Sequence, residues 1–98
     1  MPAQRTERRL QDLQRRLSAA RESFRILDEQ LAVWNDAYED ARLRSLMSET
    51  PQADHDLVEI GRHHDVAKRE RERQASEIAE LTRDRDQLLR DWNPKEMS

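Results

Sequence analysis

The sequence predicts an all-α fold, a two-helix antiparallel coiled-coil hairpin, on the basis of three observations. Charged residues make up 40% of the 98 residues, yet the net charge is only −3 because both signs are interspersed. The apolar residues recur at a mean spacing of 3.5 residues, the period of a coiled coil. Glycine occurs once and proline three times, so little interrupts a long helix. This combination favours paired helices over a compact core or a disordered chain.

The first helix is expected over about residues 4–48. No glycine or proline occurs between residues 3 and 50, and the apolar or small residues are separated by alternating steps of three and four. Such a stripe is a heptad seam that packs against another helix. The seam residues are Leu10, Leu13, Leu17, Ala20, Phe24, Leu27, Leu31, Trp34, Tyr38 and Ala41.

The turn is expected at about residues 48–50. Thr50 suits the N-cap of a helix and Pro51 suits its first position, where the missing N–H costs nothing. Proline also keeps Thr50 out of helical geometry, so the first helix ends before it. Because connections this short make neighbouring helices antiparallel, residues 1–98 are expected to form a single hairpin.

The second helix is expected over about residues 51–92, with Asn93–Pro94 as its stop and residues 93–98 as a tail. Folding at the turn sets residue i opposite roughly residue 99 − i, which places Trp34 opposite His64. The seam of this helix is interrupted by charged residues. Its apolar members include Leu57, Ile60, Ile78, Leu81 and Leu88.

A second apolar stripe runs along the first helix outside the seam. It consists of Ile26, Val33, Ala37 and Leu43, and it continues toward the turn at Met47. One hairpin cannot cover both stripes, and an isolated helix pair buries too little surface to offset its ordering entropy. We therefore expect either a second copy, forming a four-helix assembly in which the first helices pack together, or a larger protein partner.

Charge is distributed unevenly along the chain. Residues 1–25 hold seven arginines against three acidic residues, whereas residues 26–56 hold eight acidic residues against two basic ones. The hairpin tip therefore carries acid and exposed apolar side chains together. These acids either cap and solubilise the turn or enter a basic recess of a large partner. The candidate tip residues are Glu49, Asp54, Asp56, Leu46 and Met47.

The step Ser48–Glu49, followed by Ala53 and Asp54, resembles the tip of the N-terminal coiled coil of the Gre transcript-cleavage factors. That resemblance implies insertion of the tip into the secondary channel of RNA polymerase. Leu46 stands where those factors have an aspartate three residues before their glutamate, so the resemblance does not extend to metal-dependent cleavage. The overall composition also resembles that of small uncharacterised coiled-coil proteins of high-GC bacteria.

No catalytic or cofactor chemistry is expected. The chain has no cysteine, and no nucleophile–base set or glycine-rich phosphate loop occurs. His55, Glu59 and His63 share a helical face, but the outer two are ~12 Å apart along the axis, so we expect solvated residues and no metal. Direct nucleic-acid binding is not expected, because the net charge is negative and no aromatic residue is interleaved with the N-terminal arginines.

The function predicted from sequence is that of a non-enzymatic protein-binding module, adaptor or structural, acting as a homodimer. The alternative is a regulator of RNA polymerase or another large nucleic-acid machine that inserts its acidic tip. No apolar run approaches the ~20 residues that span a bilayer, and the N-terminus lacks the apolar stretch of a signal peptide. The expected compartment is therefore the cytoplasm, without membrane association.

Overall fold

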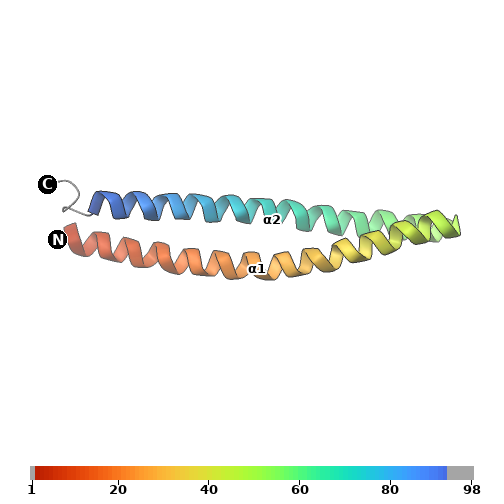
Figure 1. Ribbon diagram of the computed structural model, residues 1–98, viewed down its shortest axis with the longest axis horizontal. Helices are drawn as coiled ribbons and strands as arrows, with labels where there is room; N and C mark the ends of the chain where they lie inside the picture. The colour runs from red at the N-terminus through yellow and green to blue at the C-terminus, as the bar shows by residue number, and fades with distance from the viewer. Residues whose placement is uncertain (1, 93–98) are drawn as a thin grey trace. The chain divides into compact units, whose positions relative to one another are not determined.

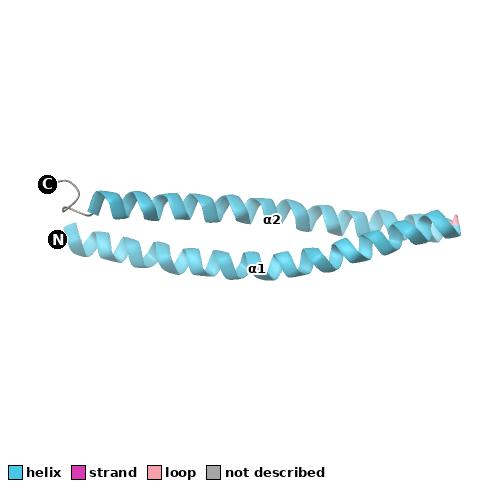
Figure 2. Ribbon diagram, in the orientation of Figure 1, coloured by secondary structure: helices cyan, strands magenta, loops and turns pink. Residues whose placement is uncertain are grey.

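The computed structural model describes the backbone of residues 2–92 and the side chains of residues 4–92. It confirms the predicted all-α helical hairpin, with helix α1 at Pro2–Ser48 and helix α2 at Pro51–Trp92 (Figure 1). Helix accounts for the whole of this range except the connection, and no strand occurs within it (Figure 2). The tail expected at residues 93–98 lies outside the described residues.

The connection between the helices consists of Glu49 and Thr50. The Thr50 hydroxyl accepts a hydrogen bond from the Ala53 amide at 3.2 Å, which is the N-cap contact that its side chain suggests. The Asp54 amide donates to the Thr50 carbonyl at 3.1 Å and so begins the hydrogen bonding of α2. Pro51 occupies the first helical position, where it has no hydrogen bond to lose.

Glu49 ends α1 with a left-handed backbone. Its φ of 51° is the conformation that commonly closes a helix, although glycine usually adopts it. The Glu49 amide still donates to the Ser45 carbonyl at 3.4 Å. The Ser45 hydroxyl in turn donates to the Asp54 carboxylate across the turn, so the two helix ends are linked by side chains as well as by backbone.

The helices divide into two compact units, which are described separately. The terminal unit comprises residues 2–23 and 74–92, and the turn unit comprises residues 24–73. The core of the terminal unit is formed by Leu13, Leu17 and Leu81, of which Leu17 is 1% exposed. Ala20, Ile78 and Leu88 pack around this core.

The turn unit buries smaller side chains. Leu31, Ala41 and Ala67 are its buried apolar residues. Small side chains at two of these three positions let the helices approach closely, and larger residues close the seam on either side. The partly buried seam residues of this unit are Phe24, Leu27, Trp34, Tyr38, Leu57 and Ile60.

Three polar contacts define how the helices of the turn unit are aligned. Ser45 bonds Asp54, His64 bonds Asn35, and Arg71 bonds Asp28. In each pair the two residue numbers add to 99, so the observed alignment agrees with the one expected from folding at the turn.

Candidate protein-binding surface

The turn unit has a polar face, defined here by Asp28, Asn35, His64 and Arg71. The Nε2 atom of His64 and the side-chain oxygen of Asn35 are hydrogen-bonded, and Arg71 Nε lies 2.6 Å from Asp28 Oδ1. Asn35 and Asp28 are seven residues apart, so they occupy the same heptad position of α1. On this face the polar groups are already used in contacts between the two helices.

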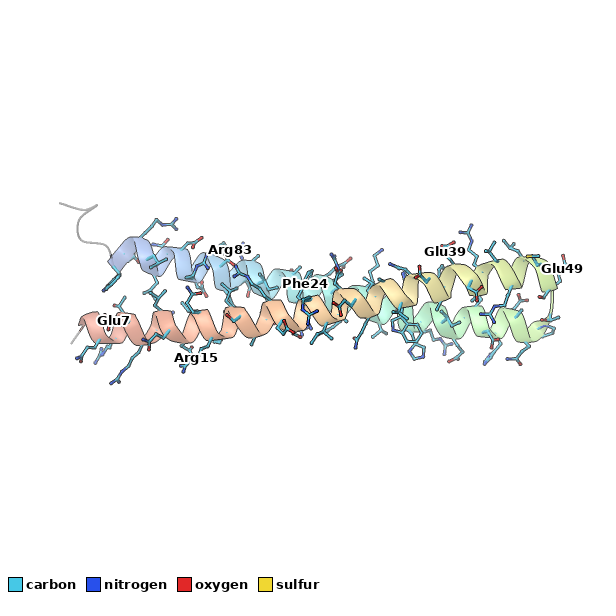
Figure 3. The ribbon with its side chains drawn as sticks, turned by 60° about the horizontal axis from the view of Figure 1, so that its bottom comes forward. Glu7, Arg15, Phe24, Glu39, Glu49 and Arg83 are labelled. Carbon is cyan, nitrogen blue, oxygen red and sulfur yellow. The ribbon has the colours of Figure 1, made fainter. Side chains whose placement is uncertain are left out.

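Arg71 makes a second contact within the turn unit. Its guanidinium carbon lies 4.9 Å from the centre of the Phe24 ring, near the helix contact at which Figure 3 labels Phe24. A cation over an aromatic face contributes about 0.5–1 kcal/mol at an exposed site. The guanidinium of Arg71 therefore contacts both Asp28 and Phe24, which stabilises a seam position where a leucine would be ordinary.

Two histidines stack on aromatic rings of α1. The His63 and Trp34 rings are 4.8 Å apart with an angle of 12° between their planes. The His64 and Tyr38 rings are 5.3 Å apart with an angle of 17°. The helix pairing expected from the sequence placed His64 opposite Trp34. The observed ring partner of Trp34 is His63, so the expected partner was wrong by one residue. Trp34 and Tyr38 occupy alternate seam positions, so the Trp34–His63 stack lies on one side of the seam and the Tyr38–His64 stack lies on the other, toward the polar face.

The opposite side of the turn unit presents apolar side chains to solvent. Val33 is 66% exposed on α1 and Val66 is 63% exposed on α2. Each lies two residues after a seam position, Leu31 or His64. Because their residue numbers add to 99, they lie at the same position along the hairpin axis, which we call the same height. Ile26 is also exposed, and Ala37 is half-buried between these residues and the seam. We call Ile26, Val33, Ala37 and Val66 the valine face.

The predicted seam residues of both units lie at the helix contact, whereas the predicted stripe lies mainly in solvent. Ile26, Val33 and Leu43 are exposed, and only Ala37 is partly covered. Leu13, Leu17, Leu31 and Leu81 are buried. The partly buried seam residues are Leu10, Phe24, Leu27, Trp34, Tyr38, Leu57, Ile60, Ile78 and Leu88.

The predicted tip residues lie together around the turn. Figure 3 shows Glu49 at the end of the hairpin, and Leu46 and Met47 are exposed beside it. Asp54 is exposed and accepts the Ser45 hydrogen bond, whereas Asp56 is half-buried and accepts from Gln52 at 2.8 Å. Two of the three tip acids therefore have local partners, while the apolar side chains beside them have none over most of their surface.

Two small hollows lie in the described part of the chain. A hollow of about 160 Å³ lies beside Arg44 and Asp56, and one of about 250 Å³ lies beside Arg9 and Asp84. Both are below the range of roughly 300–1,000 Å³ that is usual for ligand pockets. Over residues 2–92, no three His, Asp or Glu side chains gather closely enough to hold a metal ion, and neither helix has an apolar stretch that would cross a membrane.

Comparison with known proteins assigns no family. No protein-family model, curated protein or solved structure matches the chain.

The polar face was missed at the level of sequence. Asn35 and Asp28 lie outside the apolar seam, and Arg71 was predicted only as one of the charged residues that interrupt the seam of the second helix. The pairing of the two helices would have identified them. Polar residues of complementary chemistry face each other where their residue numbers add to 99, as Asn35 faces His64 and Asp28 faces Arg71.

Proposed function

We propose that this chain is a non-enzymatic protein-binding module that pairs with a second copy of itself. The observation that carries the proposal is the valine face, where Val33 of α1 and Val66 of α2 lie exposed at one height on the same side of the seam and Ile26 is exposed on that side of α1. Single exposed apolar residues are normal, but exposed apolar residues on the same side of two paired helices suit an interaction surface. The other face of the same unit is occupied by polar contacts between its own helices.

Covering the valine face is energetically worthwhile. Full burial of a valine or isoleucine side chain is worth about 1.5–3 kcal/mol relative to leaving it exposed. Ile26, Val33 and Val66 each contribute a part of this, and a symmetric pair would bury every one of them twice. Such a gain is comparable with the lower estimates of the cost of lost rotational and translational freedom on association, about 4 kcal/mol or more.

Sedimentation equilibrium tests the proposal directly. At tens of micromolar, the full chain is expected to sediment with twice the mass of 11.7 kDa. A well-folded monomer at that concentration would contradict pairing. Far-ultraviolet circular dichroism on the same sample shows whether the helices are intact, so that loss of pairing is not confused with loss of folding.

A second candidate function is that of a regulator that inserts its hairpin tip into a basic channel of RNA polymerase or a similar machine. It is supported by Met47, which is 84% exposed, and by Leu46 and Glu49 beside it. The resemblance of the tip to that of Gre factors suggests the same kind of partner. The cytoplasm is the compartment that suits both candidates, and the absence of cysteine agrees with it.

The tip candidate is tested by replacing Glu49, Asp54 and Asp56 together with Gln, Asn and Asn. If the tip binds a basic channel, capture of purified RNA polymerase by the immobilised chain is lost while helicity is unchanged. The single variant Asp54→Asn serves as the control, since it makes the same change beside Ser45 as the triple variant but removes only one charge of three. Capture that survives the triple replacement would exclude this mode of binding.

A further inference from the structure

We propose that the turn unit binds a second copy of itself through the valine face, with α1 of each chain packed antiparallel on α2 of its partner. This inference rests on the proposed function, because it specifies the geometry of the pairing. It differs from the packing of first helix on first helix that the sequence suggested. The exposed apolar residues and the charged residues beside them that support this geometry all lie within residues 24–73.

The heights of the valines define one contact. Val33 and Val66 lie at the same height because their numbers add to 99. A twofold axis parallel to the helices places a second turn unit face to face without changing any height. Each α1 then covers the partner's α2, and Val33 meets the partner's Val66. Because the contact is isologous, it occurs twice and gives two pairs of valines, one on each side of the axis.

Charged residues beside the valine face complement one another in this arrangement. On α1, Glu29 and Asp36 lie at one heptad position next to Ile26 and Val33. On α2, the same heptad position carries Arg62 and Arg69. Asp36 and Arg62 have numbers that add to 98, as do Glu29 and Arg69, so each acid reaches the height of an arginine of the partner.

These charges are available for such contacts. In the part of the chain that the structure describes, Asp36 and Arg69 have no ion pair or hydrogen bond. Arg62 is 3.6 Å from Glu59, and Glu29 is 2.7 Å from Arg25. Both of these pairs are solvent-exposed contacts within one helix, which are worth only about 0.3–0.5 kcal/mol and rearrange easily.

The same charges disfavour the packing of α1 on α1. That arrangement would bring the Glu29 and Asp36 edge of one chain against the identical edge of its partner, where acids face acids. Like charges placed together in an interface reduce affinity, whereas opposite charges set its alignment. In the arrangement proposed here, Asp40 comes to the height of the partner's Glu59, and Arg44, which lies 2.9 Å from Asp40, offsets this like-charge contact.

A matched pair of substitutions tests which face is used. Val66→Glu places a carboxylate on the valine face, and we expect the dimer dissociation constant to rise at least about 100-fold. Val58→Glu is the control, because Val58 is 52% exposed on the same helix but on the other side of the seam. This control is expected to change the constant less than about twofold. Glutamate suits an exposed helix, so both variants are expected to fold.

A charge exchange tests the alignment. Asp36→Arg and Arg62→Asp are each expected to weaken pairing about 10-fold, because each contact occurs twice. The double variant is expected to recover most of that loss. Since the two side chains point outward from separate helices of one chain, recovery reports a contact between chains. Weakening by both single variants without recovery in the double variant would overturn the proposed alignment.

Disulfide trapping separates this inference from the proposed function. The chain has no cysteine, so Val33→Cys and Val66→Cys introduce the only thiols. We expect a covalent dimer to form faster when the two variants are mixed than in either one alone. Trapping by Val33→Cys alone, with none in the mixture, would overturn this geometry but leave self-pairing intact. Monomeric sedimentation of the unmodified chain would overturn both.

Discussion

At the scale of single residues, Glu49 and Gly61 are the two positions where backbone freedom and residue type do not match. Glu49 adopts a φ of 51°, which favours glycine, whereas the only glycine lies inside α2. Tyr38 lies beside Gly61, but an added Cβ would be 3.5 Å from Tyr38 Cε2, which is ordinary contact. The glycine is therefore not required for packing.

Glu49→Gly is expected to stabilise the fold by about 0.5–1 kcal/mol, since glycine adopts the left-handed conformation without the Cβ clash. The measurement is the midpoint of urea unfolding. Glu49→Ala is the control, because it removes the carboxylate but retains the Cβ. Equal stabilisation by both variants would show that charge, and not backbone strain, is responsible.

Gly61→Ala is expected to stabilise the fold by about 0.8–1 kcal/mol, the helix propensity difference between the two residues. Thermal unfolding followed by circular dichroism measures the change. The reverse substitution, Ala75→Gly at the same heptad position of the exposed surface, is expected to cost a similar amount. A destabilising Gly61→Ala would mean that Tyr38 cannot tolerate the added methyl group.

At the scale of the elements, the start of α2 depends on the cap formed by Thr50. Its hydroxyl satisfies the Ala53 amide, which would otherwise be one of the unpaired donors of the first turn. Asp54 lies in that turn, where a carboxylate suits the positive end of the helix dipole. The turn is thus held from both sides, by this cap and by the link between Ser45 and Asp54.

Thr50→Ala is expected to destabilise the hairpin by about 1 kcal/mol because the capping oxygen is lost. Thr50→Ser keeps that oxygen and is expected to change stability by less than half as much. Urea unfolding of both variants measures the difference. If serine is as destabilising as alanine, the threonine methyl group matters more than the hydrogen bond.

At the scale of the whole molecule, pairing couples folding to concentration. If the folded chain is a dimer, its unfolding temperature rises with protein concentration by mass action. We expect this rise for the unmodified chain over the range from 1 to 100 µM, taken as an order-of-magnitude span. Val66→Glu is expected to remove the concentration dependence, while Val58→Glu retains it. Differential scanning calorimetry at several concentrations provides the measurement.

Much of the fold and part of the surface follow from the pattern of residues. The heptad steps of the first helix and the Thr50–Pro51 pair predict two helices and the turn between them. The position of that turn also predicts that the numbers of facing residues add to about 99. Which side chains meet across the seam could not be predicted so directly. Adding residue numbers gives the position of each residue along the hairpin, but not the side of the seam toward which its side chain points. Trp34 was therefore paired with His64, whereas its observed partner is His63.

The sequence by itself determined the all-α hairpin, since periodic apolar residues and one proline-marked turn leave few other ways to bury the seam. Only the tertiary structure decided which exposed residues share a face. Val33 and Val66 are remote in sequence, and they form one surface because antiparallel packing brings equal heights together. The same packing assigns Asn35, His64, Asp28 and Arg71 to the other face. A linear pattern specifies the side of one helix, whereas a surface made by two helices depends on their contact.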